Sequence, residues 1–224
     1  MRHAVLFAAA LAVAEPASAC EVALVVAIDV SRSVDAREFD LIRHGTAEAF
    51  RNPEILRLVD WLEGGISVAV TQWSGEDEQA VALPWRHVAS AAEMGQAADE
   101  IDTMRREFRY DLTAPGEALA HADALFASAP VVCRRQVIDL SGDGVQNAGA
   151  LTGAIADAIE ARGVTINGLV VRGDTPDPLD FYETEVRRGP LGFIEIATGY
   201  DDFGAAMFRK LLRELTPSLS DNRP

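Results

Sequence analysis

The chain has 224 residues and a net charge of −15, and 49% of its residues are hydrophobic and 25% charged. A chain of this length and composition is usually one globular domain with a well-buried core. The strong negative charge argues against nucleic acid as a ligand, because the phosphate backbone would be repelled.

The first nineteen residues are typical of a secretory signal peptide. An apolar run over 4–14 follows a basic start, and Ala17-Ser18-Ala19 is the small-residue pattern that precedes a cleavage site. The run is shorter than the roughly 20 residues that cross a bilayer, and no later segment is long enough. We therefore predict a cleaved signal peptide over 1–19, one domain over 20–224, no transmembrane segment, and export to the periplasm or the cell exterior.

Export allows two interpretations of the two cysteines, Cys20 and Cys133. In an oxidising compartment a pair of cysteines normally forms a disulfide. Alternatively, a cysteine directly after a cleavage site can be the acylated first residue of a bacterial lipoprotein. Such sites usually carry Leu three residues upstream, where this chain has Ala17. The disulfide is therefore the favoured interpretation.

Apolar segments recur along the chain and indicate strands. The first is the continuous run Val22 to Ile28, which is typical of a parallel strand covered on both faces. Similar segments follow at 66–73, 136–140 and 164–171. The stretch 78–84 is predicted as an edge strand, joined to the preceding strand by the polar turn 74–77.

Helical patterns alternate with these strands. Asp35 and Glu38 form a predicted capping box at the start of the first helix. Further helices are predicted from Pro115, from Ala150 to Arg162 with a left-handed cap at Gly163, and from Asp202 to Leu215. Alternation of strands and helices predicts an α/β fold with a mainly parallel sheet.

Oxygen-bearing side chains follow the strands at the places where ligands bind in α/β sheets, beyond the carboxyl ends. Asp29, Ser31 and Ser33 follow the first strand, Thr113 precedes a helix, and Asp143 follows a later strand. Carboxylate and hydroxyl oxygens are hard donors, which Mg²⁺, Mn²⁺ and Ca²⁺ prefer. No His or Cys lies in these segments, which disfavours zinc and copper.

These segments resemble the metal-ion-dependent adhesion site of von Willebrand factor A domains. The matching motifs are Asp29-x-Ser31-x-Ser33, Thr113 in a Thr-x-x-Gly-x-Ala-Leu setting, and Asp143-Gly144 after a strand. The resemblance implies a doubly wound, mainly parallel six-stranded sheet with helices on both faces. It also implies that these five side chains hold a divalent cation, Mg²⁺ before Mn²⁺ or Ca²⁺, some directly and some through water. An Asp or Glu carboxylate of a partner protein would then occupy the last coordination position.

The rest of the chain after the signal peptide is similar to one uncharacterised bacterial family of exported proteins within that group, a domain of unknown function. The stretches that carry this similarity are Trp73-Ser74, Pro84-Trp85, Val137 to Asp143, Ile166-Asn-Gly168 and Phe203 to Glu214. This similarity supports the fold and the cation, and adds nothing about the ligand.

The resemblance also bears on the cysteines, because in this family the first strand lies beside the strand that ends at the second Asp. Cys20 is nine residues before Asp29, and Cys133 is ten before Asp143. Neighbouring strands are about 4.8 Å apart, within reach of a disulfide. We therefore expect a Cys20–Cys133 bridge at the sheet edge opposite the cation, which would stabilise the fold by about 4 kcal/mol in the chain-entropy model.

The function that the resemblance implies is metal-dependent binding of a protein, not catalysis. Two alternatives stay open: a hydrolase that uses the same cation as a Lewis acid, and a structural domain whose cation is idle. The hydrolase lacks a visible general base beside the site.

Two other carboxylates also need an interpretation. Asp111 either assists the cation or only faces solvent. Asp139 lies inside a predicted strand, so it should pair with a backbone amide or an Arg in a structural role.

Overall fold

The computed structural model describes residues 20–109, 112–173 and 175–216. The predicted signal peptide over 1–19 and Asp111 therefore lie outside the described residues. Among those described, no helix has the length and apolar character that a membrane span requires.

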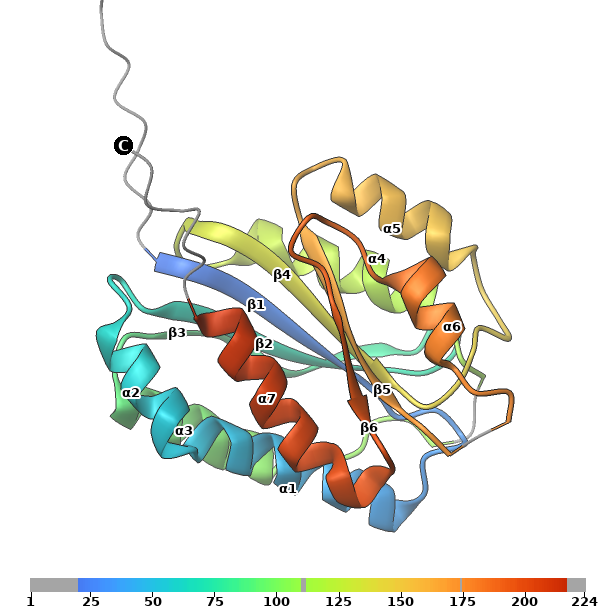
Figure 1. The fold of residues 1–224 in the computed structure, drawn as a ribbon, viewed down its shortest axis with the longest axis horizontal. Helices are drawn as coiled ribbons and strands as arrows, with labels where there is room; N and C mark the ends of the chain where they lie inside the picture. The colour runs from blue at the N-terminus through green and yellow to red at the C-terminus, as the bar shows by residue number, and fades with distance from the viewer. Residues whose placement is uncertain (1–19, 110–111, 174, 217–224) are drawn as a thin grey trace, which may run out of the picture.

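The described residues form one six-stranded sheet with helices on both faces (Figure 1). The strand order is β3-β2-β1-β4-β5-β6, and every neighbouring pair is parallel except β2 and β3. The predicted doubly wound, mainly parallel sheet is confirmed. The strands are β1 (Cys20–Asp29), β2 (Ile66–Trp73), β3 (Gln79–Val88), β4 (Cys133–Gly142), β5 (Thr165–Val171) and β6 (Ile194–Ala197).

The helices form two layers, each with its own apolar core. One layer contains α1 (Ala36–Arg51), α2 (Pro53–Trp61), α3 (Ala91–Asp102) and α7 (Phe203–Leu215). The other contains α4 (Pro115–Leu125), α5 (Thr152–Glu160) and the short α6 (Leu179–Phe181), which continues into a π-helical turn over Tyr182–Val186. Short 3-10 turns lie at Phe126–Ser128 and Tyr200–Asp202.

The central strand β1 is apolar without alternation, and every one of its residues is buried. Leu24, Val26 and Ile28 pack into the core that α1 and α7 cover, whereas Val25 and Ala27 pack into the core that α4 and α5 cover. Because helices cover both faces of β1, an apolar side chain is favoured at each position of the run.

Local sequence signals set several helix ends as predicted. Asp35 Oδ1 accepts a hydrogen bond from the Glu38 amide at 2.8 Å, and Glu38 Oε2 accepts one from the Asp35 amide at 2.7 Å. This is the predicted capping box at the start of α1. Gly163 has a φ of +85°, so the predicted left-handed residue after α5 is confirmed. The helix itself is shorter at both ends than the predicted range 150–162.

Four elements were not located by the sequence patterns: α2, α3, the short α6 and β6. The helix α2 follows α1 after a single residue, Asn52, so the two resemble one interrupted helix in the sequence. The strand β6 has only four residues, too few to show a period. The strand β3 runs on through Pro84 to Val88, which an edge strand tolerates because its outer amides are not needed for pairing.

The helices α1 and α7 approach closely at two glycines. A Cβ built on Gly45 would lie 2.8 Å from the Cα of Gly204, so a larger residue would push the helices apart. This contact fixes the start of α7 beside the carboxyl end of the sheet. It thereby positions Tyr200, in the turn just before α7.

The predicted disulfide between Cys20 and Cys133 is confirmed. The two residues are register partners on β1 and β4, and their Cα atoms are 4.4 Å apart. The bond joins residues 113 apart in the sequence, at the amino ends of both strands. A sulfur in this bond cannot also carry a lipid, which weighs against the lipoprotein interpretation.

Asp139 is buried and paired, as expected, but its partner is a lysine. Lys210 Nζ lies 2.6 Å from Asp139 Oδ1 and 2.5 Å from Glu214 Oε1, and all three side chains are at most 1% exposed. The expectation of a backbone amide or an Arg was wrong. Lys210 reaches Asp139 from α7, which is distant in the sequence and comes close only through packing of the helix on the sheet.

Candidate metal site

Two of the predicted site residues, Asp29 and Asp143, lie side by side at the carboxyl end of the sheet. Strand β1 ends at Asp29, and β4 ends one residue before Asp143. Because β1 and β4 are parallel neighbours, with Ile28 opposite Ser141, the two carboxylates meet at one edge. They are only 2% and 3% exposed.

A chain of polar contacts joins four of the five predicted residues. Asp29 Oδ1 accepts a hydrogen bond of 2.8 Å from the Ser31 amide, which turns the loop back toward the strand. The hydroxyls of Ser31 and Ser33 are 3.3 Å apart. Ser33 Oγ donates a hydrogen bond of 2.8 Å to Asp143 Oδ1, across 110 residues of sequence. The structure thus brings these oxygen atoms together from two separate loops.

The fifth residue, Thr113, lies beside this group. Its amide donates to Asn147 Oδ1 at 2.8 Å, and its carbonyl accepts from the Asn147 amide at 3.1 Å. A Cβ built on Gly144 would lie 3.9 Å from both Oγ1 and Cγ2 of Thr113, so the end of this side chain lies near the turn that carries Asp143. Ser33 and Thr113 both line a cavity of about 200 Å³.

Two tyrosines that the sequence patterns did not single out complete the site. Tyr200 donates a hydrogen bond of 2.7 Å to Asp143 Oδ2. Tyr182 is fully buried, and among the described residues its hydroxyl has no hydrogen-bond partner. A Cβ on Gly142 would clash with that hydroxyl and lie 2.8 Å from Asp29 Oδ2, so only glycine fits there. No local signal distinguishes these tyrosines from ordinary core aromatics.

Arg106 stabilises the loop after β1 through hydrogen bonds to its backbone. Its Nη2 donates hydrogen bonds of 2.9 Å to the carbonyls of Val30 and Ser31. Burial and the nearby charge of Arg109 lower the pKa of Arg106, whereas Asp29 acts in the opposite direction. Arg106 belongs to the charged segment 105–109, which precedes Thr113, and this segment therefore holds the loop after β1 in place.

The electrostatics of the site favour the binding of positive charge. Burial, and then the charge of Asp143, raise the pKa of Asp29 from 3.8 to about 7, although Ser31 and Arg106 oppose the shift. Burial and Asp143 also raise the pKa of the Tyr200 hydroxyl, which therefore remains a donor. Asp29 Oδ2 is buried and has no hydrogen-bond partner among the described residues. A buried acceptor without a partner costs free energy, and a cation would remove this cost.

The donor set fits a hard divalent cation. Two carboxylates and the hydroxyls of two serines and a threonine supply oxygen ligands alone, as Mg²⁺, Mn²⁺ and Ca²⁺ prefer. Within the described residues, no group of three or more His, Cys, Asp or Glu side chains has the arrangement of a metal site. The candidate site therefore depends on its hydroxyls.

A family model described as a protein of unknown function, DUF1194, matches residues 19–219. Comparison with curated proteins gives no match.

Several solved structures share the fold. Proximal thread matrix protein 1 (PTMP1) from the mussel byssus is 16% identical, with a TM-score of 0.64 over 89% of this chain and 49% of that chain. A von Willebrand factor type A protein from Catenulispora acidiphila is 19% identical, with a TM-score of 0.59 over 88% and 43%. The pilus adhesin SpaC from Lactobacillus rhamnosus GG is 12% identical, with a TM-score of 0.62 over 88% and 30%.

This chain spans about half or less of the length of these three proteins. Similarity at such low identity shows the fold alone, whereas the family model covers nearly the whole chain. The chain belongs to the DUF1194 family, and its fold is that of von Willebrand factor A domains.

Proposed function

We propose that this protein is an exported domain that binds a partner protein through a divalent cation. Asp29, Ser31, Ser33, Thr113 and Asp143 would hold the cation, with Mg²⁺ preferred and Mn²⁺ or Ca²⁺ as alternatives. The observation that carries the proposal is the convergence of two buried carboxylates and two serine hydroxyls from loops 110 residues apart.

The chemistry of the donors suits the capture of an acidic group. When bound, the cation would supply a coordination position for an Asp or Glu carboxylate of the partner. Ser31, Ser33 and Thr113 are neutral, so they fill positions without cancelling positive charge. Tyr200 holds Asp143 by its Oδ2, and Arg106 holds the loop that carries Ser31. These contacts keep the donors in place before a cation or a partner arrives.

The similar structures support this proposal at the level of the fold. SpaC is a pilus adhesin, and one PTMP1 structure has a zinc-occupied MIDAS motif. Among the described residues no His or Cys joins the candidate donors, so zinc is not the preferred cation. The preference for Mg²⁺ rests on the all-oxygen donor set.

Catalysis by the same site is the weaker candidate. A hydrolase would need a general base within hydrogen-bond reach of the reacting group. The described histidines lie elsewhere: His44 contacts Asp102, His87 is on β3 and His121 is on α4. We therefore propose a binding protein and not an enzyme.

The test has two stages, so that cation binding and partner binding are separated. Calorimetry with Mg²⁺, Mn²⁺ and Ca²⁺ should show a single site that Asp143→Ala abolishes and Asp99→Ala, on the exposed face of α3, leaves intact. Capture from envelope proteins should then require Mg²⁺, be lost with a chelator, and be lost in Asp143→Ala.

Three results would contradict the proposal. Absence of cation binding would remove the site itself. Cation binding without metal-dependent capture would favour the idle structural domain, and turnover of ester or phosphate substrates would favour the hydrolase.

A further inference from the structure

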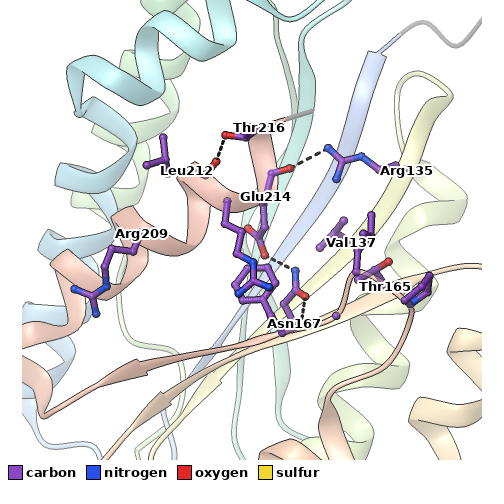
Figure 2. Close-up of a pocket in the computed structure, with 13 residues that line it drawn as sticks. Arg135, Val137, Thr165, Asn167, Arg209, Leu212, Glu214 and Thr216 are labelled. Carbon is purple, nitrogen blue, oxygen red and sulfur yellow. Dashed lines mark hydrogen bonds between the residues drawn. The ribbon is translucent and has the colours of Figure 1, made fainter. Parts of the chain in front are cut away.

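A second cavity lies at the end of the sheet opposite the candidate metal site. It has a volume of about 520 Å³ and is enclosed by the first residues of β4 and β5, the turn before β6 and the end of α7 (Figure 2). The candidate metal site is at the carboxyl ends of β1 and β4, so the two sites are separated by the length of the strands. A volume of this size is in the range of small-molecule sites.

A buried carboxylate, that of Glu214, lines the cavity, and one of its two oxygens has no hydrogen-bond partner among the described residues. Glu214 is 3% exposed, and its Oε1 accepts from Asn167 Nδ2 at 2.7 Å and from Lys210 Nζ at 2.5 Å. Its Oε2 has no hydrogen-bond partner among the described residues. Figure 2 shows the Glu214 carboxylate beside Asn167, among the side chains that line the cavity. Since an unpaired buried acceptor is costly, this oxygen favours a ligand with an N–H or O–H donor.

Three arginines line the cavity around this acceptor, and two of them are paired with carboxylates. Arg135, Arg209 and Arg213 all line the cavity, although the chain as a whole has a net charge of −15. Arg135 donates to the Glu214 carbonyl at 2.9 Å and pairs with Glu21 at 3.5 Å, and Arg209 pairs with Glu195 at 2.6 Å. Arg213 stacks on Phe193, 3.8 Å from the ring centroid, and forms no ion pair with any described residue. Its guanidinium is therefore available for an anion.

The remaining walls are largely apolar. Val137, Leu191, Phe193 and Leu212 line the cavity, and Leu191 is 46% exposed. An apolar group of a ligand would remove this surface from water, with a gain of about 25 cal/mol for each Å² buried.

We propose that this cavity binds a carboxylate ligand that has an amide N–H next to the carboxylate and an apolar side chain. The carboxylate would pair with Arg213, the N–H would donate to Glu214 Oε2, and the side chain would contact Leu191 and Leu212. An N-acylated amino acid and the carboxyl end of a peptide share this chemistry. The proposal does not depend on cation binding at the other end of the sheet.

The experiment uses the purified protein and calorimetric titration. The first ligand is N-acetyl-L-leucine, compared with N-acetyl-L-leucinamide, which lacks the carboxylate. The acid should bind, and the amide should bind at least tenfold more weakly. A tetrapeptide ending in leucine distinguishes the two sources: tighter binding than the N-acetyl compound indicates a peptide end, and weaker binding indicates a small acylated amino acid.

Variants test the two contacts. Arg213→Gln keeps most of the side chain and should weaken binding of the acid at least tenfold, whereas the exposed control Arg37→Gln should leave it unchanged. Glu214→Gln keeps one acceptor oxygen for Asn167 and Lys210 but places an NH2 donor where Oε2 accepted, and should weaken binding several-fold. If Glu214→Gln does not fold, the binding measured with Arg213→Gln still tests the proposal. Equal binding of acid and amide, unchanged binding by Arg213→Gln, or no binding of any of the three ligands would overturn the proposal.

Discussion

The Tyr200 hydroxyl donates a hydrogen bond of 2.7 Å to Asp143 Oδ2, and this contact links the start of α7 to the candidate metal site. Tyr200 lies in the turn that α7 continues, and α7 packs on α1 through Gly45 and Gly204. The orientation of Asp143 therefore depends on the packing of a helix from the other end of the chain.

Replacement of this tyrosine should destabilise the cation-free protein. Tyr200→Phe leaves a buried carboxylate oxygen without its donor, so we expect a loss of about 1–3 kcal/mol in the free energy of unfolding. Urea unfolding in the presence of a chelator measures this loss. The matched control is Tyr182→Phe, because the Tyr182 hydroxyl has no hydrogen-bond partner among the described residues. Equal effects of the two variants would contradict the assigned role of Tyr200.

The effect of Mg²⁺ on thermal stability should depend on pH. The pKa of Asp29 is raised from 3.8 to about 7 in the folded protein, so the folded state holds its proton more tightly than the unfolded state. This contribution is fully present below pH 3.8 and is lost as the pH rises through about 7. A proton on Asp29 also competes with a cation. We therefore expect Mg²⁺ to raise the Tm more at about pH 8 than at about pH 5.5.

Asp29→Asn tests whether Asp29 causes this pH dependence. The amide has the same shape as the carboxylate but does not titrate. The variant should show little difference in the Mg²⁺-induced Tm change between the two pH values. A difference as large as that of the unmodified protein would assign the pH dependence to another group.

The disulfide should contribute strongly to stability. The bond between Cys20 and Cys133 closes a loop across 113 residues, which in the chain-entropy model stabilises the fold by about 4 kcal/mol. Urea unfolding of the Cys20→Ser/Cys133→Ser protein should show most of this loss. The unmodified protein under reducing conditions should match the double variant, and a stability equal to that of the oxidised protein would contradict the prediction.

Lys210 should be essential for stability because its ammonium group pairs with two buried carboxylates, those of Asp139 and Glu214. Lys210→Met leaves Asp139 and Glu214 without their shared cation, at a cost of about 3–5 kcal/mol. Adding Asp139→Asn to this variant should recover part of the loss, since one of the two uncompensated charges is removed. Urea unfolding of the single and double variants measures the coupling. No recovery in the double variant would show that the cost comes from packing and not from charge.

Local patterns predicted much of the fold. The apolar run of β1, the capping box of Asp35 and Glu38, and the left-handed Gly163 each depend on residues close in the sequence, and each was confirmed. The positions of Asp29 and Asp143 after strands predicted that their carboxylates would meet. The short strand β6 and the helices α2, α3 and α6 had weaker local signals and were not located.

By itself, the sequence determined the α/β fold, and it predicted the disulfide, once the family's strand order was applied, and the oxygen donors of the candidate site. Only the tertiary structure decided that Tyr200 contacts Asp143, that Lys210 pairs with Asp139, and that Glu214 lies in a cavity with Arg213. The physical reason is that periodicity and caps act between near neighbours in the chain. Contacts made by α7 depend instead on how this helix packs on strands that are distant in the sequence.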